Sequence, residues 1–96
     1  MKSDTTPRFK LDYNSPDNVK DSLSFHERII EFISLNINEE IDSEILCYFV
    51  DDEGLDMVAE LPRNAYTQAL NKSLEFFTEQ ENYEKCKIVK EIIEKI

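Results

Sequence analysis

The fold is decided by residues 44–61, which read EILCYFVDDEGLDMVAEL and predict a β-hairpin. Two apolar runs flank the acidic turn at 51–54. Gly54 is the only glycine in the chain, and it stands where a hairpin turn needs a residue with positive φ. A type I turn closed by a glycine bulge fits this spacing. We therefore expect two antiparallel strands, over about 45–50 and 55–61.

The two runs of the hairpin have different patterns. The first run is apolar on both faces, which predicts that it is the better covered strand. The second run alternates, with Asp56 and Glu60 on one face, although Val58 breaks the alternation. Because a two-stranded hairpin is not stable alone in water, the helices on either side must pack on it. The apolar face of the second run comprises Leu55, Met57, Ala59 and Leu61.

A helix is predicted before the hairpin. Ser15 followed by Pro16 is typical of an N-cap and a first helical position, so the helix is expected over about 16–37. A break near 22–24, with Ser24 restarting the helix, is an alternative start. The apolar side chains of this segment recur at three- and four-residue steps and form one stripe.

Two helices are predicted after the hairpin, over about 63–78 and 82–96. Pro62 ends the second strand because proline cannot continue a sheet ladder, and Asn82 is the expected N-cap of the last helix. The fold class expected is therefore α+β: an N-terminal helix, a two-stranded antiparallel β-hairpin and a C-terminal αα-hairpin. These elements form a single small domain over 15–96.

Residues 1–14 are predicted to be a flexible or extended N-terminal arm, since Pro7 and mixed charges give no helical period. Phe9, Leu11 and Tyr13 alternate, so the arm could add an edge strand to the hairpin or grip a partner. A structural subunit whose arm, from Phe9 to Tyr13, joins the sheet of a neighbour is one hypothesis for function.

Length and composition favour one cytoplasmic domain. The 96 residues, 41% of them hydrophobic, can bury a modest single core. No apolar run approaches the length of a membrane span, and the N-terminus lacks the apolar core of a signal peptide. Cys47 and Cys86 are too few for a disulfide framework, so both are predicted to be reduced, buried small hydrophobes.

The formal charge of −10 is spread unevenly along the chain. Residues 21–62 carry one basic group, Arg28, against twelve acidic groups, whereas 63–96 carry six of each sign. Such a surface repels nucleic acid and anionic membranes and favours a basic partner protein. It also keeps a small protein soluble, which is the simpler explanation.

Residues 74–96 resemble the UvrB/UvrC helical-hairpin motif. The segment 83–86, Tyr-Glu-Lys-Cys, supplies the first part of that motif; Val-Lys-Glu at 89–91, closed by Ile93, supplies the second. Lys87, Lys90 and Glu91 depart from the usual residues of the family. The resemblance implies a non-catalytic hairpin that docks on a similar hairpin of another protein. An ordinary antiparallel pair of helices is the alternative.

The sequence predicts neither catalysis nor a cofactor. His26, the only histidine, has no nucleophile or orienting carboxylate at a telling spacing, so we expect a structural role for it. The acidic turn is a poor calcium loop, because the first ligand position falls on Phe49 and strands flank the turn. A single glycine cannot build a phosphate-binding loop, and no zinc spacing occurs.

The first functional prediction is a small acidic adaptor or regulator that binds another protein through its C-terminal helical hairpin. Ile88, Ile92 and Ile96 are the expected contacts, since they widen the apolar stripe beyond what one helix covers, and homodimerisation would also hide them.

The alternative is an acidic inhibitor, such as a phage gene could encode, that mimics nucleic acid and occupies the basic groove of a nucleic-acid-binding protein. The carboxylates that would replace phosphates are those of Asp51, Asp52, Glu53, Asp56 and Glu60.

Overall fold

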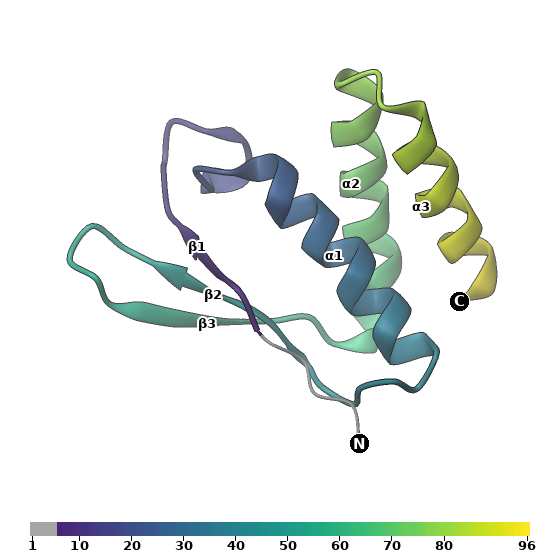
Figure 1. Ribbon diagram of the computed structural model, residues 1–96, viewed down its shortest axis with the longest axis horizontal. Helices are drawn as coiled ribbons and strands as arrows, with labels where there is room; N and C mark the ends of the chain where they lie inside the picture. Colours follow the sequence, from purple (N-terminus) through teal and green to yellow (C-terminus); the bar gives the residue numbers. More distant parts are fainter. Residues whose placement is uncertain (1–5) are drawn as a thin grey trace.

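A computed structural model describes residues 6–96 of the chain and contains three α-helices and a three-stranded mixed sheet. The first part of the predicted arm, residues 1–5, lies outside the described residues. The strands are β1 (Arg8–Lys10), β2 (Ile45–Val50) and β3 (Asp56–Glu60), and the α-helices are α1 (Ser22–Ile37), α2 (Tyr66–Glu79) and α3 (Tyr83–Lys95). Short 3-10 turns, η1 (Pro16–Asn18) and η2 (Arg63–Ala65), precede α1 and α2. The α+β class is confirmed (Figure 1).

The sheet has three strands, so the prediction of a two-stranded sheet is wrong. Its order is β1-β2-β3, with β1 parallel to β2 and β2 antiparallel to β3. The arm supplies the third strand: Tyr48 donates its backbone N–H to the carbonyl of Pro7, and Leu11 donates to the carbonyl of Val50. Parallel strands need a crossover, and α1 provides it. The two remaining strands and the turn between them follow the prediction.

The turn has the predicted glycine bulge. Gly54 has φ +83° and donates to the carbonyl of Asp51, while the N–H of Asp51 donates to the carbonyl of Leu55. The Asp51 carboxylate also accepts from the backbone N–H groups of Glu53 and Leu55, both at 2.9 Å. Local hydrogen bonds therefore set the register of β2 and β3.

The start of α1 differs from the prediction. Pro16 begins a single 3-10 turn, in which Asp17 and Asn18 have φ of 58° and 59°, so the chain reverses before the helix begins. The N-cap is Asp21, whose side chain accepts from Ser24 at 3.1 Å. Helix α1 thus starts at the break that the sequence offered as an alternative, because the preceding residues bend away.

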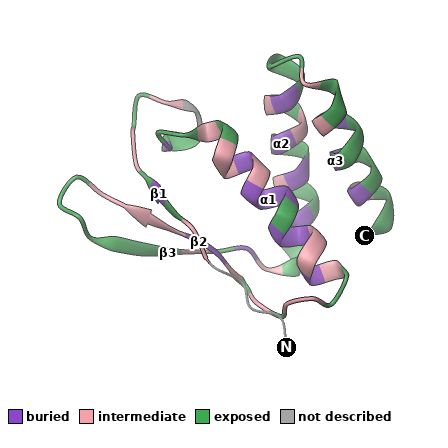
Figure 2. Cartoon of the chain, in the orientation of Figure 1, coloured by how far each residue is buried: buried purple, intermediate pink, exposed green. Residues whose placement is uncertain are grey.

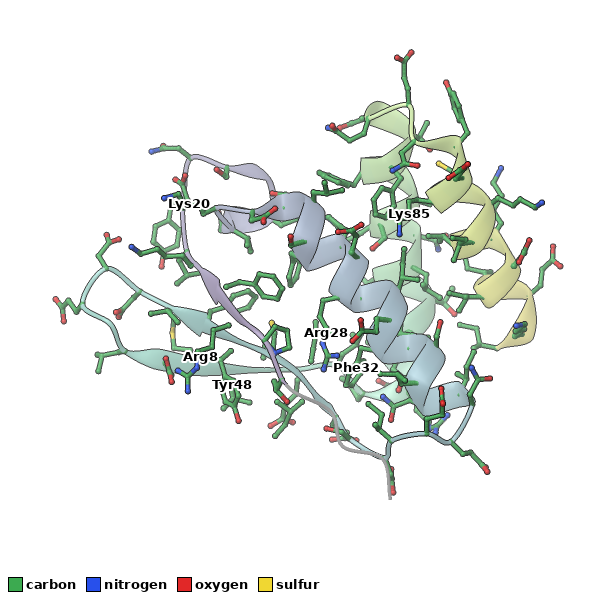
Figure 3. The ribbon with its side chains drawn as sticks, viewed as in Figure 1. Arg8, Lys20, Arg28, Phe32, Tyr48 and Lys85 are labelled. Atoms are coloured by element: carbon green, nitrogen blue, oxygen red, sulfur yellow. The ribbon has the colours of Figure 1, made fainter. Side chains whose placement is uncertain are left out.

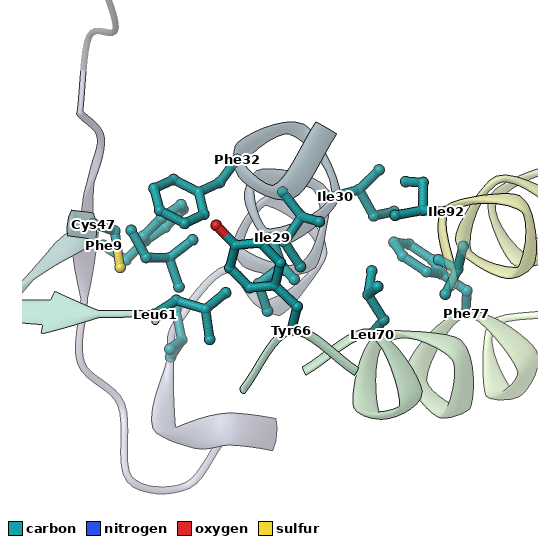
Figure 4. Packing of buried hydrophobic residues seen from close by; sticks show 14 of the residues in the cluster. Phe9, Ile29, Ile30, Phe32, Cys47, Leu61, Tyr66, Leu70, Phe77 and Ile92 are labelled. Atoms are coloured by element: carbon teal, nitrogen blue, oxygen red, sulfur yellow. The ribbon is translucent and has the colours of Figure 1, made fainter. Parts of the chain in front are cut away.

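Helix α1 lies between the sheet and the α2–α3 pair and buries two sides (Figures 1 and 2). In the close-up, Phe32 faces the sheet side of the core, whereas Ile30 lies beside Ile92 of α3 (Figure 4). Phe25 of α1 packs against Phe9 and Phe49 of the sheet, with ring centroids 5.7 Å apart in both pairs. The wide apolar stripe of α1 is explained by this central position.

Buried polar groups tie α1 to β2. A register shift between Ile45 and Cys47 makes a bulge, and Arg28 of α1 donates its Nε–H to the carbonyl of Leu46 there at 2.8 Å. Strand β1 begins only opposite Tyr48, so the guanidinium takes the place of a strand neighbour. The guanidinium also lies 5.3 Å from the ring centroid of Phe32. Arg28 is therefore a structural cation.

Helices α2 and α3 form an antiparallel pair as predicted, and Asn82 is the N-cap of α3. The turn between the helices places Glu81 at φ 57°, with hydrogen bonds from Asn82 to the carbonyl of Phe77 and from Glu81 to that of Thr78. This is the hydrogen-bond pattern of a glycine-type helix C-cap, built here without glycine. Within residues 6–96, no helix is long and apolar enough to cross a membrane.

Candidate functional site

The predicted contacts of the C-terminal hairpin do not share one surface. Ile92 is buried at 5% exposure in the core, beside Ile30 of α1, so it is not available to a partner. Ile88 and Ile96 are 39% and 47% exposed. The prediction of a three-residue stripe therefore needs correction: helix α1 covers its middle, and two separate isoleucines remain outside.

The acidic residues of the hairpin do not form a continuous row. The Asp51 carboxylate accepts hydrogen bonds from backbone N–H groups within the turn, and Asp56 is ion-paired with Arg8 of β1. Asp52 lines a shallow hollow together with Lys10 and Lys20. Glu53 and Glu60 are exposed at opposite ends of the β-hairpin. Cations of β1 and of the following loop therefore lie beside Asp52 and Asp56.

A buried polar cluster that the sequence did not reveal lies around His26. The ring of His26 is 1% exposed; its Nδ1 is 2.8 Å from Oγ of Ser73, and its Nε2 is 2.6 Å from a carboxylate oxygen of Asp17. Phe76 stacks on the ring with centroids 4.4 Å apart. Asp17 comes from η1, His26 from α1 and Ser73 from α2, so the cluster joins three elements. The available signal was Ser73, a polar residue at core spacing between Leu70 and Phe77.

The cluster has the residue types of a serine hydrolase but not the geometry. Ser73 is fully buried at 0% exposure, so no substrate carbonyl can reach its hydroxyl. Hollows of about 240 and 220 Å³ flank His26, yet neither is lined by Ser73. The arrangement instead satisfies buried polar atoms and fixes the left-handed turn at Asp17 against α1.

Both cysteines belong to the hydrophobic core. Cys47 and Cys86 are free and buried, as predicted. Burial raises the pKa of the Cys47 thiol to about 11, although the nearby Arg28 guanidinium acts in the opposite sense, so the thiol stays protonated at neutral pH. Within residues 6–96, no group of three or more His, Cys, Asp or Glu side chains is placed to hold a metal ion.

The surface that stands out is the free edge of β3, at the end of the hairpin that projects away from the helices (Figures 1 and 2). Leu55, Met57 and Val58 are 61%, 44% and 54% exposed. Sheet coverage ends further back, where Ala59 is half-buried and Leu61 is buried. Met57 and Val58 lie on opposite faces of the sheet, so the exposed apolar side chains border the free edge of β3 on both faces.

The backbone of β3 also has an open side. Asp51 and Leu55 are hydrogen-bonded partners, and the register continues as Val50↔Asp56 and Phe49↔Met57. By the alternation of antiparallel pairs, the N–H and C=O groups of every second residue point away from β2. We define the β3 edge as the outward backbone groups of Asp56, Val58 and Glu60 together with the side chains of 55–60. No strand among residues 6–96 pairs with it.

Within residues 6–96, no helix covers the face of the sheet opposite α1. Arg8 and Tyr48 lie on this outer face, on the side away from the helices (Figure 3). The Arg8 guanidinium lies 5.4 Å from the Tyr48 ring centroid and pairs with Asp56 across β2. Asp56, Val58 and Glu60 share the outer face of β3, because alternate side chains of a strand point the same way.

Comparisons with protein-family models, with curated proteins and with solved structures find no match for this chain.

Proposed function

We propose that the protein is a small non-catalytic protein-protein interaction module whose docking surface is the β3 edge. The observation that carries the proposal is the exposure of Leu55, Met57 and Val58 on an edge strand. Natural edge strands are usually short, charged or covered, because an open edge templates pairing with other chains. An edge that keeps three large apolar side chains in solvent is best explained by a partner that covers them.

The mode of docking that fits this edge is strand addition. A partner segment in an extended conformation would pair with the outward N–H and C=O groups of Asp56, Val58 and Glu60. Main-chain hydrogen bonds supply affinity in this mode, and alternate side chains supply specificity. The hydrogen-bonded turn around Gly54 fixes β3 in the extended conformation that pairing requires, which lowers the entropy cost of binding.

The β3 edge replaces the C-terminal hairpin as the preferred surface, because Ile92 belongs to the core. A weak or transient complex is expected, since a single added strand buries less surface than a standard interface.

Affinity capture with three forms of the protein tests the proposal. Wild type, Val58→Lys and Ile88→Asp are immobilised and exposed to lysate of the cells that encode the protein, and bound proteins are identified by mass spectrometry. We expect a partner that binds wild type and Ile88→Asp but not Val58→Lys, because lysine on the edge opposes strand addition.

Loss of the partner with Ile88→Asp alone would instead place docking on the C-terminal hairpin and overturn the β3 edge. A salt series distinguishes the nucleic-acid mimic: a partner of that kind is released at about 0.5 M salt, where the screening length falls to a few ångströms. Asp52→Lys should also release it, whereas a strand-addition partner should tolerate that change at the exposed turn.

A further inference from the structure

We propose that the occupant of the β3 edge is an extended basic segment, with two Lys or Arg residues four positions apart beside Asp56 and Glu60 and with apolar residues between them. This inference rests on the proposed function and adds the chemistry of the partner.

The outer face of β3 sets the spacing. Asp56, Val58 and Glu60 are alternate residues of the strand, so their side chains follow one another along the same face. A strand added in either direction places side chains opposite these three positions, with Cβ atoms about 5 Å apart. Opposite charges in such pairs stabilise the sheet and like charges destabilise it. The two carboxylates therefore select cations at the first and fifth positions of the occupant.

The inner face sets the residues in between. Met57 lies opposite Phe49, whose ring contacts Phe25 of α1, so Met57 shares the inner face of the sheet; both Met57 and Leu55 are nevertheless exposed. An added strand turns its second and fourth side chains toward this face. These two side chains would lie opposite Met57 and Ala59, and apolar groups there would cover the exposed Met57, so the pattern is basic, apolar, any, apolar, basic.

A second copy of the chain is a poor occupant. If two β3 strands paired antiparallel about Val58, Asp56 of each chain would lie opposite Glu60 of the other, twice in the dimer. Both chains also carry a formal charge of −10, so long-range repulsion adds to the local clash. The same carboxylates that suit a basic segment thus work against self-association.

Arg8 supplies an internal test of this chemistry. Its guanidinium is already ion-paired with Asp56, with the arginine side chain 60% exposed. An incoming cation opposite Asp56 must share that carboxylate with Arg8. Replacement of Arg8 by glutamine should therefore strengthen binding of a basic segment, by about threefold for one exposed ion pair. A role of Arg8 in the fold alone would not produce this gain.

Peptide binding followed by NMR tests the inference. The probe is the acetylated, amidated heptapeptide Thr-Lys-Val-Thr-Val-Lys-Thr, titrated into the ¹⁵N-labelled full chain. Amide signals of 56–60 should shift and gain protection from hydrogen exchange. A peptide with glutamate in place of both lysines should bind about tenfold more weakly, because two attractive pairs become repulsive.

Two controls separate strand pairing from simple charge attraction. The peptide Val-Thr-Lys-Lys-Thr-Thr-Val has the same composition but adjacent lysines, and it should bind more weakly than the probe. Val58→Pro removes an outward N–H from the edge and should abolish binding of the probe. Val58→Lys, which keeps the backbone intact, should weaken it as well.

Equal binding of the lysine and glutamate peptides, or of the rearranged peptide, would overturn the charge pattern but leave the β3 edge as the docking surface. Shifts confined to α3 would overturn both proposals. If no peptide binds, the basic segment is wrong, and the capture experiment with Val58→Lys decides separately whether the β3 edge binds a protein of other chemistry.

Discussion

Helix α3 and strand β3 look alike in the sequence, since both alternate apolar and charged residues at the period of their element. In the structure they have opposite environments. The stripe of α3 is covered, with Cys86, Val89 and Ile92 buried against the rest of the core. The apolar residues at the end of β3 face solvent. The period of a pattern thus identifies residues that share a face, but not whether another element covers that face.

The difference comes from how far the neighbouring helices extend over each element. Helix α3 packs mainly along α2, and Ile30 of α1 lies beside its Ile92, so the buried stripe of α3 is covered by its own chain. The β-hairpin is longer than the helix layer can cover, and its last residues project beyond it. Function is therefore expected at the projecting end, and stability at the covered end.

The largest expected effect belongs to the covered helix. Ile92→Ala should lower the free energy of unfolding by about 3 kcal/mol, because it leaves a cavity in a packed core. Ile88→Ala is the matched control and should cost less than about 1 kcal/mol, since that side chain is 39% exposed. Urea unfolding of the two variants measures the difference. Equal losses would contradict the placement of Ile92 in the core.

The free energy of unfolding should depend on alkaline pH through Cys47, on the inner face of β2. The pKa of Cys47 rises from 9.0 to about 11 on folding, so the unfolded chain loses its thiol proton first as the pH rises. The free energy of unfolding should therefore be intact below pH 9 and fall by about 2 kcal/mol toward pH 11. Cys47→Val removes this contribution, and its stability should decline less over the same range in urea titrations. Burial also raises the pKa of Tyr66, which affects both proteins alike.

In the exposed turn of the hairpin, substitution of Gly54 should lower the stability of the protein. Gly54 has φ +83°, and a Cβ there would meet no atom within 4 Å, so the cost of a side chain is conformational alone. Gly54→Ala should lower the free energy of unfolding by about 1 kcal/mol. Gly54→Asn should cost less, because asparagine tolerates the left-handed region. If both variants matched wild type in thermal unfolding, the turn would not be strained by a side chain.

In the turn between α2 and α3, a substitution to glycine should raise the free energy of unfolding. Glu81 occupies a left-handed position, φ 57°, that glycine usually fills at a helix end. Glu81→Gly should raise the free energy of unfolding by about 0.5 kcal/mol, since relief of the left-handed penalty exceeds the extra entropy of the unfolded chain. Glu81→Ala keeps the penalty and serves as the control. A glycine variant less stable than the alanine variant would refute this account.

The smallest expected effect is at the β3 edge itself. Val58→Lys should change the free energy of unfolding by less than about 0.5 kcal/mol, because the side chain is 54% exposed and packs on no helix. The same change is expected to weaken binding of the lysine peptide. Urea unfolding and peptide titration of one sample check both statements. A large loss of stability would mean that Val58 supports the fold and would weaken its assignment to a docking surface.

Local chemistry explains which parts of the fold could be predicted. The β-hairpin and its turn depend on hydrogen bonds between near neighbours, and Asn82 caps α3 through a residue three positions away. The sequence offers two starts for α1 but cannot choose between them, because the turn at Asp17 depends on a tertiary contact with His26. The cluster at Ser73 is likewise visible only when α1 and α2 are placed together.

The prediction that Ile92 contacts a partner is wrong for a similar reason. The wide stripe of α3 indicated a partner, but the partner of Ile92 is α1 of the same chain. The alternation of β3 predicts that its apolar residues share one face of the hairpin, but it does not predict how far the helices cover that face. Only the relative lengths of the hairpin and the helix layer show that Leu55 and Met57 lie beyond cover.

The parallel position of β1 has a consequence for how the chain is made. Phe9 is synthesised forty positions before Phe49, which is its neighbour in the sheet. Closing that long loop is costly, whereas the β2–β3 and α2–α3 pairs form between neighbours in sequence. During vectorial synthesis the segment around Phe9 therefore has no strand neighbour until β2 has emerged from the ribosome.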